Sequence, residues 1–201
     1  MKQHLASASP SLWNQKNFPS GAGALARSSH RGWMASELSR ELRTGTGDFL
    51  GERRAIVVLS LVAIGAMGLI SLYQTGVVKH LPEPPLPGLD ADRVDASDEA
   101  YQRFSTPDAV LGLGSYALTM ALAEVGGQDR ARKQPWLPLG LAGKIGFDLA
   151  QVVRMTRIQW TKYRAFCFWC LLSAAATVAS AVLTFGEARQ AAQQIARRAR
   201  K

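Results

Sequence analysis

The chain has 201 residues, a formal net charge of +9 and 47% hydrophobic residues, which suits either one or two soluble domains or one small membrane bundle. Its basic residues gather beside apolar stretches and do not alternate with aromatic ones in one patch, so we expect no nucleic-acid partner. With only two cysteines, the chain lacks the multiple disulfides of a small stapled secreted domain.

Residues 1–50 are rich in Ser, Gly, Arg and Ala, without a sustained helical or strand period. We therefore expect a disordered cytoplasmic N-terminal segment, within which a short helix over residues 34–42 is compatible with the sequence. The segment has no apolar core of the kind that marks a secretory signal.

Residues 55–73 are uncharged and read AIVVLSLVAIGAMGLISLY, directly after Arg53 and Arg54. A helix of this length crosses about 30 Å of hydrocarbon. A helix this apolar on all sides is rarely found in a soluble core, so we predict a transmembrane span.

Residues 74–108 form the longest predicted loop, and its two halves differ. Four prolines, at positions 82, 84, 85 and 87, exclude a helix from the first half. The second half is acidic and has room for a short helix. Acidic residues outnumber basic ones across the whole loop.

Residues 109–125 and 137–158 are the two weaker predicted spans. The first is rich in small residues, and Gly112, Gly114 and Ser115 fit close helix packing. The second carries Lys144 and Asp148, which lie four apart on one helical face and can pair across a turn. Charges in a membrane are costly, so this helix must face a polar interior or lie near the interface.

Residues 166–186 form the fourth predicted span, FCFWCLLSAAATVASAVLTFG, and a basic tail follows over 189–201. Four spans place the basic N-terminal segment, the 126–135 turn and the tail on one side, which the positive-inside rule assigns to the cytoplasm. The acidic loop then lies outside. Four basic residues before the last span oppose this orientation, at positions 154, 157, 162 and 164.

The two cysteines, Cys167 and Cys170, form a C-x-x-C motif at the predicted start of the last helix. Residues three apart share a helical face, so the two sulfurs can meet. The helix N-terminus, with Lys162 and Arg164 nearby, favours the thiolate of Cys167, the attacking species in disulfide exchange.

Other interpretations of the motif remain open. Cysteine also packs as a small apolar residue, and a chance C-x-x-C is common. We expect no metal site, because a structural zinc needs four ligands and the three histidines are scattered. Phe166, Phe168 and Trp169 around the motif could border a flat apolar ligand such as a quinone, or anchor the helix at the membrane interface.

Two segments together resemble the vitamin K epoxide reductase family, including its bacterial homologues. One is YRAFCFWCLLSAAATVASAVLTF, and the other is SDEAYQRFSTPDAVLGLGSYAL, with the turn Phe104-Ser105-Thr106-Pro107 before the second span. The resemblance covers about residues 55–188. It implies an all-α, four-helix transmembrane domain over residues 51–188 in a bacterial inner membrane, with both termini cytoplasmic.

The resemblance also implies a chemistry, in which the Cys167–Cys170 dithiol passes electrons to a quinone, either ubiquinone or menaquinone. Cys170 would lie nearest the quinone and Cys167 would exchange with the incoming thiol. Ser97 is carried over as a pocket-lining residue, and Tyr116 joins the three aromatics of the motif as a candidate quinone contact.

One departure from the family pattern bears on the mechanism. Family members usually carry a second cysteine pair in the first outer loop, whereas residues 74–108 hold none, and Asp95 and Ala96 stand about where one is expected. A separate thioredoxin-like or other thiol protein on the outer side is therefore the implied partner. The alternatives are a non-enzymatic protein that binds quinone, lipid or a partner on the same scaffold, and a thiol-based metal or stress sensor.

Overall fold

The computed structural model describes residues 35–101 and 106–200, and it divides the chain into two compact units. The first unit, Met1–Arg43, is helical in the part described, and residues 35–44 match the short helix expected near residues 34–42. Most of the segment predicted to be disordered, residues 1–34, lies outside the described residues. The second unit, Thr44–Lys201, contains the features discussed below.

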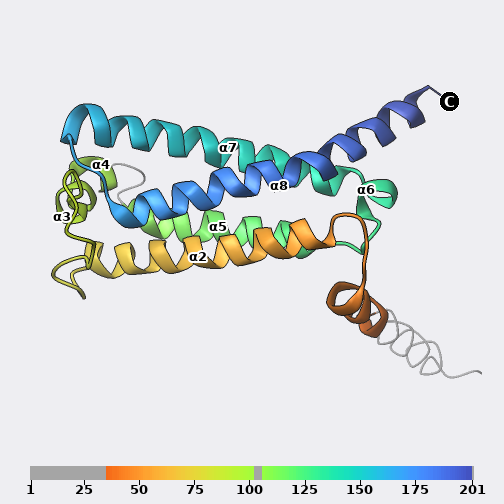
Figure 1. The fold of residues 1–201 in the computed structure, drawn as a ribbon, viewed down its shortest axis with the longest axis horizontal. Coiled ribbons are helices and arrows are strands. Elements are labelled where there is room, and N and C mark those ends of the chain that lie inside the picture. The colour runs from red at the N-terminus through yellow and green to blue at the C-terminus, as the bar shows by residue number, and fades with distance from the viewer. Residues whose placement is uncertain (1–34, 102–105, 201) are drawn as a thin grey trace, which may run out of the picture. The chain divides into compact units, whose positions relative to one another are not determined.

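Four long helices of the second unit lie side by side: α2 (Leu50–Gln74), α5 (Asp108–Glu124), α7 (Trp136–Ile158) and α8 (Phe168–Ala199) (Figure 1). Helix α2 contacts α5 and α8, and α7 closes the ring by contacting the same two helices. In the part of the chain that is described, the only strand-like pairing is one isolated bridge between Leu89 and Phe166. The predicted all-α class is confirmed, and a long helix occupies each of the four predicted ranges except for residue 125 and residues 166–167.

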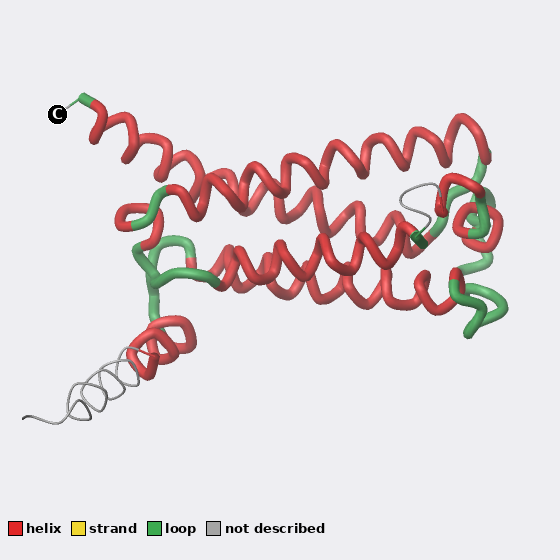
Figure 2. Tube along the Cα trace, turned by 180° about the vertical axis from the view of Figure 1, so that it is seen from behind, coloured by secondary structure: helices red, strands yellow, loops and turns green. Residues whose placement is uncertain are grey.

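Short helices and loops close the two ends of the ring (Figures 1 and 2). One end holds α3 (Ala91–Asp95), α4 (Asp98–Tyr101) and the π-helical turn η1 (Gln159–Tyr163). The proline-rich stretch before α3 contains no helix, as predicted. Phe104 and Ser105 of the predicted turn lie outside the described residues. The other end holds α6 (Arg130–Lys133).

Helix α5 illustrates how local sequence sets a boundary. It begins directly after Pro107, which cannot occupy a helix interior, and Asp108 places a carboxylate in the favourable first turn. It ends before Gly126, whose φ of 89° favours glycine. A Cβ at Gly126 would lie 3.0 Å from Leu137 Cδ1, so the Leu137 side chain would have to shift by a few tenths of an ångström to admit one.

Small residues allow α2 and α5 to approach each other, though not at every predicted position. A Cβ added to Gly112 would lie 2.7 Å from Met67 Sδ, so glycine there permits the contact. Gly114 faces open space, whereas Ser115 contacts α7 by donating a hydrogen bond to Asp148 at 2.8 Å. The prediction of helix contact is therefore confirmed for Gly112 and Ser115 and wrong for Gly114.

Apolar side chains cover the outside of the ring as well as its inside. Helices α2 and α8 are long and apolar enough to cross a membrane. Large hydrophobic residues are exposed on all four helices, among them Val58, Leu61, Leu118, Phe147, Val153, Val182 and Phe185. Exposed apolar surface of this extent would be unfavourable in water and is expected where lipid surrounds a protein.

The end of the ring near α6 is held by buried charges, Arg53, Arg130 and Glu187, which we call the arginine end. Arg130 and Glu187 form a two-bond ion pair, with both N···O distances 2.7 Å and side chains 0% and 4% exposed. Arg53 donates to the carbonyl of Ala123 at 2.7 Å and to the four that follow. The two guanidinium groups thus satisfy carbonyls that the end of α5 leaves without helical partners.

Candidate active site

The two cysteines meet at the start of α8, as their spacing predicted. Cys167 is the residue that caps the helix, and its Sγ accepts a hydrogen bond from the backbone N–H of Cys170 at 3.2 Å. Both are free thiols, and their sulfurs lie within 4.8 Å of each other.

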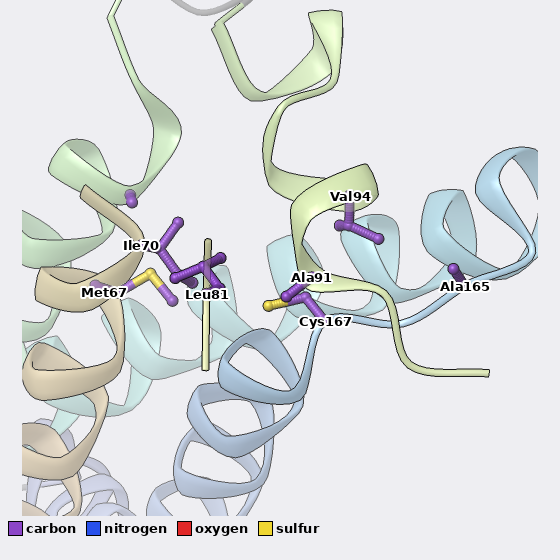
Figure 3. Packing of buried hydrophobic residues seen from close by; sticks show 8 residues of the cluster. Met67, Ile70, Leu81, Ala91, Val94, Ala165 and Cys167 are labelled. Atoms are coloured by element: carbon purple, nitrogen blue, oxygen red, sulfur yellow. The ribbon is translucent and has the colours of Figure 1, made fainter. Parts of the chain in front are cut away.

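Cys167 is fully buried, with 0% of its surface exposed. It packs in a cluster with Leu81, Ala91 and Val94 of the loop after α2 (Figure 3). We call residues 81–95 the cap. Backbone bonds join the cap to the start of α8, from Asp90 N–H to Phe166 O at 2.9 Å and from Phe166 N–H to Gly88 O at 2.8 Å. An incoming thiol therefore reaches Cys167 only after the cap moves.

The cap also holds the indole of Trp169, the residue between the two cysteines. Its Nε1–H donates to the carbonyl oxygen of Pro82 at 2.8 Å. This bond links the proline-rich part of the cap directly to the first turn of α8. The prolines therefore serve to shape a cover over the cysteine pair.

Asp95, the last residue of α3, brings a carboxylate to the cysteine pair. The side chain is buried, with the residue 3% exposed. Its Oδ1 accepts a hydrogen bond from the Cys170 thiol at 3.6 Å, whereas its Oδ2 has no hydrogen-bond partner within residues 35–101 and 106–200. The backbone carbonyl of Asp95 accepts from Gln74 Nε2 at 3.3 Å, which fixes the end of α3 against α2.

Burial raises the pKa of Asp95 from 3.8 to about 7. Hydrogen bonds from the thiols of Cys167 and Cys170 oppose this rise, and the carboxylates of Asp108 and Glu83 add to it. The carboxyl group of Asp95 consequently changes protonation state near neutral pH.

A cavity of about 230 Å³ lies beside Cys170, between α5, α7 and α8. Asp95 lines one part, and apolar residues make up much of the wall: Met67, Ile70, Leu111, Phe147, Val152, Met155 and Ala174. Leu111 of α5 and Phe147 of α7 are 38% and 60% exposed, so the wall reaches the apolar outer surface between these helices. The cavity therefore combines a cysteine thiol with an apolar wall that reaches the outer surface of the ring.

A polar cluster lies further along α7, and two of its residues, Ser115 and Asp148, line the cavity. Asp148 forms the predicted ion pair with Lys144 and accepts a hydrogen bond from Ser115 Oγ at 2.8 Å. Lys144 also donates to Thr119 Oγ1 at 2.6 Å. Lys144 and Asp148 thus face the interior of the ring and pair there, whereas Arg154 and Arg157 of the same predicted span are exposed.

The other predicted quinone contacts divide into two groups. Tyr116 lines the main cavity, and Ser97 lines a smaller one of about 40 Å³ that also touches Asp95 and Cys170. None of the three aromatics of the motif lines the main cavity. Phe166 stacks on Trp160 with ring centroids 5.8 Å apart, and Phe168 packs edge-on against Trp169.

Asp95, Cys167 and Cys170 also gather three potential metal-ligand atoms within 4.8 Å of one another. A structural zinc site uses four protein ligands. Within the described residues no fourth Cys, His, Asp or Glu joins this group. The arrangement fits a dithiol with a neighbouring proton acceptor better than a closed metal site.

Fold and site together define a helical membrane protein that holds a buried dithiol beside an apolar cavity. A comparison with protein families matches residues 54–185 to the vitamin K epoxide reductase family, and the chain belongs to that family. A comparison with functionally curated proteins gave no significant match.

Family membership indicates a membrane oxidoreductase that works on thiols and a quinone, generally together with thiol partner proteins. The cavity fits a quinone ring in its chemistry, because an apolar wall suits the ring and Cys170 supplies a redox group at its edge. Sequence reasoning noted Asp95 only as the position of a missing cysteine. Its contact with Cys170 was not foreseen.

Proposed function

We propose that this protein is a membrane thiol–disulfide oxidoreductase in which the Cys167–Cys170 dithiol passes two electrons to a quinone. Such a reaction supports disulfide formation in an extracytoplasmic partner. The observation that most favours it is the position of Cys170, which lines an apolar cavity whose wall reaches the lipid-facing surface. A quinone dissolved in the membrane would enter by that side, without crossing water.

The roles of the two sulfurs follow from their surroundings. Cys170 lines the cavity and would be the sulfur nearest the quinone. Cys167 lies under the cap and would exchange with the incoming thiol once the cap opens. Tyr116 and Ser115 line the same cavity and are candidate contacts for the quinone oxygens. The apolar wall of this cavity would suit the ring of either ubiquinone or menaquinone.

We further propose that all four long helices cross a bacterial inner membrane with both termini in the cytoplasm. Exposed apolar residues on α5 and α7 support spans beyond the two that are apolar throughout. The basic residues on the outer side are the main objection. Lys162, one of them, pairs with Glu99 of the acidic loop, which reduces its weight as a cytoplasmic signal.

The electron donor would be a separate thiol protein, thioredoxin-like or of another kind. Residues 74–108 contain no cysteine to relay electrons, so the donor must act on Cys167 directly. The complete burial of Cys167 favours one alternative, a quinone- or lipid-binding protein on the same scaffold that no longer exchanges thiols.

Maleimide labelling in membranes distinguishes these two functions. The proposal predicts two reactive thiols after reduction and none after addition of a quinone, because the pair has closed to a disulfide. A double variant, Cys167→Ser with Cys170→Ser, gives the background. A pair that stays reduced with either quinone present would leave only the binding function.

A further inference from the structure

Asp95 is a buried carboxylate at the cysteine pair for which no pattern in the sequence predicted a role. We propose that Asp95 is a catalytic residue that accepts the proton of the Cys170 thiol and releases it into the cavity. This inference rests on the proposed function and names its proton acceptor.

The geometry gives Asp95 both contacts that a proton carrier needs. Its Oδ1 already accepts a hydrogen bond from the Cys170 thiol at 3.6 Å, so the proton has a direct path from sulfur to oxygen. The same side chain lines the cavity beside Cys170. A proton taken from the sulfur thus arrives at a group that borders the site where a quinone would be reduced.

The surroundings of Asp95 argue against a purely structural role. A buried carboxylate that only stabilises a fold is normally paired or fully hydrogen-bonded, as Glu187 is by Arg130. Among the described residues, the Oδ2 atom of Asp95 instead has no hydrogen-bond partner. The charged groups that face it, from the cap and α5, are the carboxylates of Glu83 and Asp108.

Titratable groups on two further helices, α2 and α8, also face Asp95. From α2, the Tyr73 hydroxyl faces Asp95 together with Asp90 and Asp92, and from α8 come the two thiols. Burial and the neighbouring carboxylates disfavour the negative charge of Asp95, and hydrogen bonds from the two thiols only partly offset them, so Asp95 holds a proton readily. A carboxyl group poised near neutral pH is suited to accept a proton and to release it again.

Electrons and protons balance when the dithiol is oxidised by one quinone. Oxidation of the dithiol breaks two S–H bonds, forms one S–S bond and releases two electrons and two protons, which together convert one quinone to one quinol. Asp95 receives the proton of Cys170 as that sulfur becomes the thiolate. The proton of Cys167 leaves when its sulfur bonds to Cys170.

The test is the pH dependence of alkylation of Cys170 by iodoacetamide, without quinone, in the full-length Cys167→Ser protein. Below pH 7 both groups hold their protons, so the thiolate fraction and the rate should rise about tenfold per pH unit. Above pH 7 sulfur and carboxylate share one proton, so the rate should level off. In the same protein with Asp95→Asn the bend near pH 7 should vanish and the rate should keep rising.

Asp98→Asn is the matched control, because Asp98 is an exposed carboxylate three residues further along the same loop, and the bend should persist there. If the alkylation rate of the Cys167→Ser protein shows no bend near pH 7 while Asp95 is intact, the inference is overturned. Identical profiles with and without the carboxylate would overturn it equally.

A second readout separates this inference from the function on which it rests. Asp95→Asn should slow quinone-linked oxidation of the dithiol on the order of 100-fold, as loss of a general base typically does. If the pH profile of Cys170 alkylation shows the bend but the protein reduces no quinone, the proposed function is refuted and the proton transfer to Asp95 still holds. Unimpaired quinone reduction by Asp95→Asn would refute the role of Asp95 alone.

Discussion

The two ends of the helical ring both bury charge, but they treat it in opposite ways. At the arginine end, Arg130 pairs with Glu187 through two hydrogen bonds, and Arg53 donates to five consecutive carbonyls. At the cysteine end, Asp95 is equally buried, and one of its oxygens has no hydrogen-bond partner in the part of the chain that the structure describes.

This difference indicates which end is built for stability and which for reaction. Buried polar groups that are satisfied on every side hold a fold in one arrangement. A buried carboxylate with spare hydrogen-bonding capacity costs stability and is retained where chemistry uses it. The comparison therefore points to the cysteine end as the reactive one, independently of the cysteines themselves.

The largest effect should come from Cys170→Ser, which leaves a single sulfur that cannot form the intramolecular disulfide. We expect quinone reduction to fall to the level of the double cysteine variant while the helix content measured by circular dichroism is unchanged. Turnover at the unsubstituted rate would refute the mechanism.

Cys167→Ser should trap no mixed disulfide with a partner, and capture of one would mean that the two sulfur roles are reversed.

The next largest effect should come from Glu187→Gln, at the arginine end. The substitution leaves Arg130 buried without its counter-charge, which should destabilise the fold by about 3–5 kcal/mol. Unfolding in mixed detergent micelles measures this free energy. Arg132→Gln is the control, because Arg132 forms an exposed ion pair with Asp48 that should contribute at most about 1 kcal/mol.

Asp95→Asn should stabilise the protein at high pH, whereas Glu187→Gln should destabilise it. In the folded protein the pKa of Asp95 is raised from 3.8 to about 7. The free energy of unfolding is therefore highest below pH 4, where Asp95 is protonated, and it falls as the pH rises to 7. The loss is on the order of 4 kcal/mol at most, at about 1.4 kcal/mol per tenfold change in proton affinity. Unfolding at pH 4 and pH 8 measures it. A variant no more stable than the parent at pH 8 would contradict the cost we assign to this carboxylate.

The smallest effect should come from Trp169→Phe, which removes the hydrogen bond to Pro82 and keeps an aromatic ring. One such bond contributes about 1 kcal/mol, so the cap should open more often and maleimide should label Cys167 about fivefold faster in a Cys170→Ser protein. Phe168→Leu is the comparison, since Phe168 is adjacent to the same indole. Equal labelling rates would show that the cap is held by its backbone bonds alone.

Local sequence patterns were sufficient for the helices and for the meeting of the two cysteines. The uncharged runs over residues 55–73 and 166–186 specify apolar helices, and C-x-x-C spacing places two sulfurs on one helical turn. The ion pair of Lys144 with Asp148 was predictable for the same reason, since both residues lie on one helix.

Contacts between distant segments were not predictable from these patterns. Asp95 meets Cys170 across 75 positions in the sequence, and Arg130 meets Glu187 across 57. Sequence reasoning treated Arg53 and Arg130 as signals of membrane orientation and did not foresee that their guanidinium groups turn inward. It also placed Cys167 within reach of a partner, whereas the cap covers it completely.

The sequence by itself thus determined the apolar helices, the proline-rich loop and the redox-type spacing of the cysteines. Each of these depends on residues within one or two helical turns, where backbone geometry fixes which side chains are neighbours. Only the tertiary structure decided that a carboxylate lies beside Cys170, that the cap buries Cys167, and that a cavity forms at the reactive sulfur. Those features arise where separate helices pack, and the shape of that packing depends on all the side chains at once.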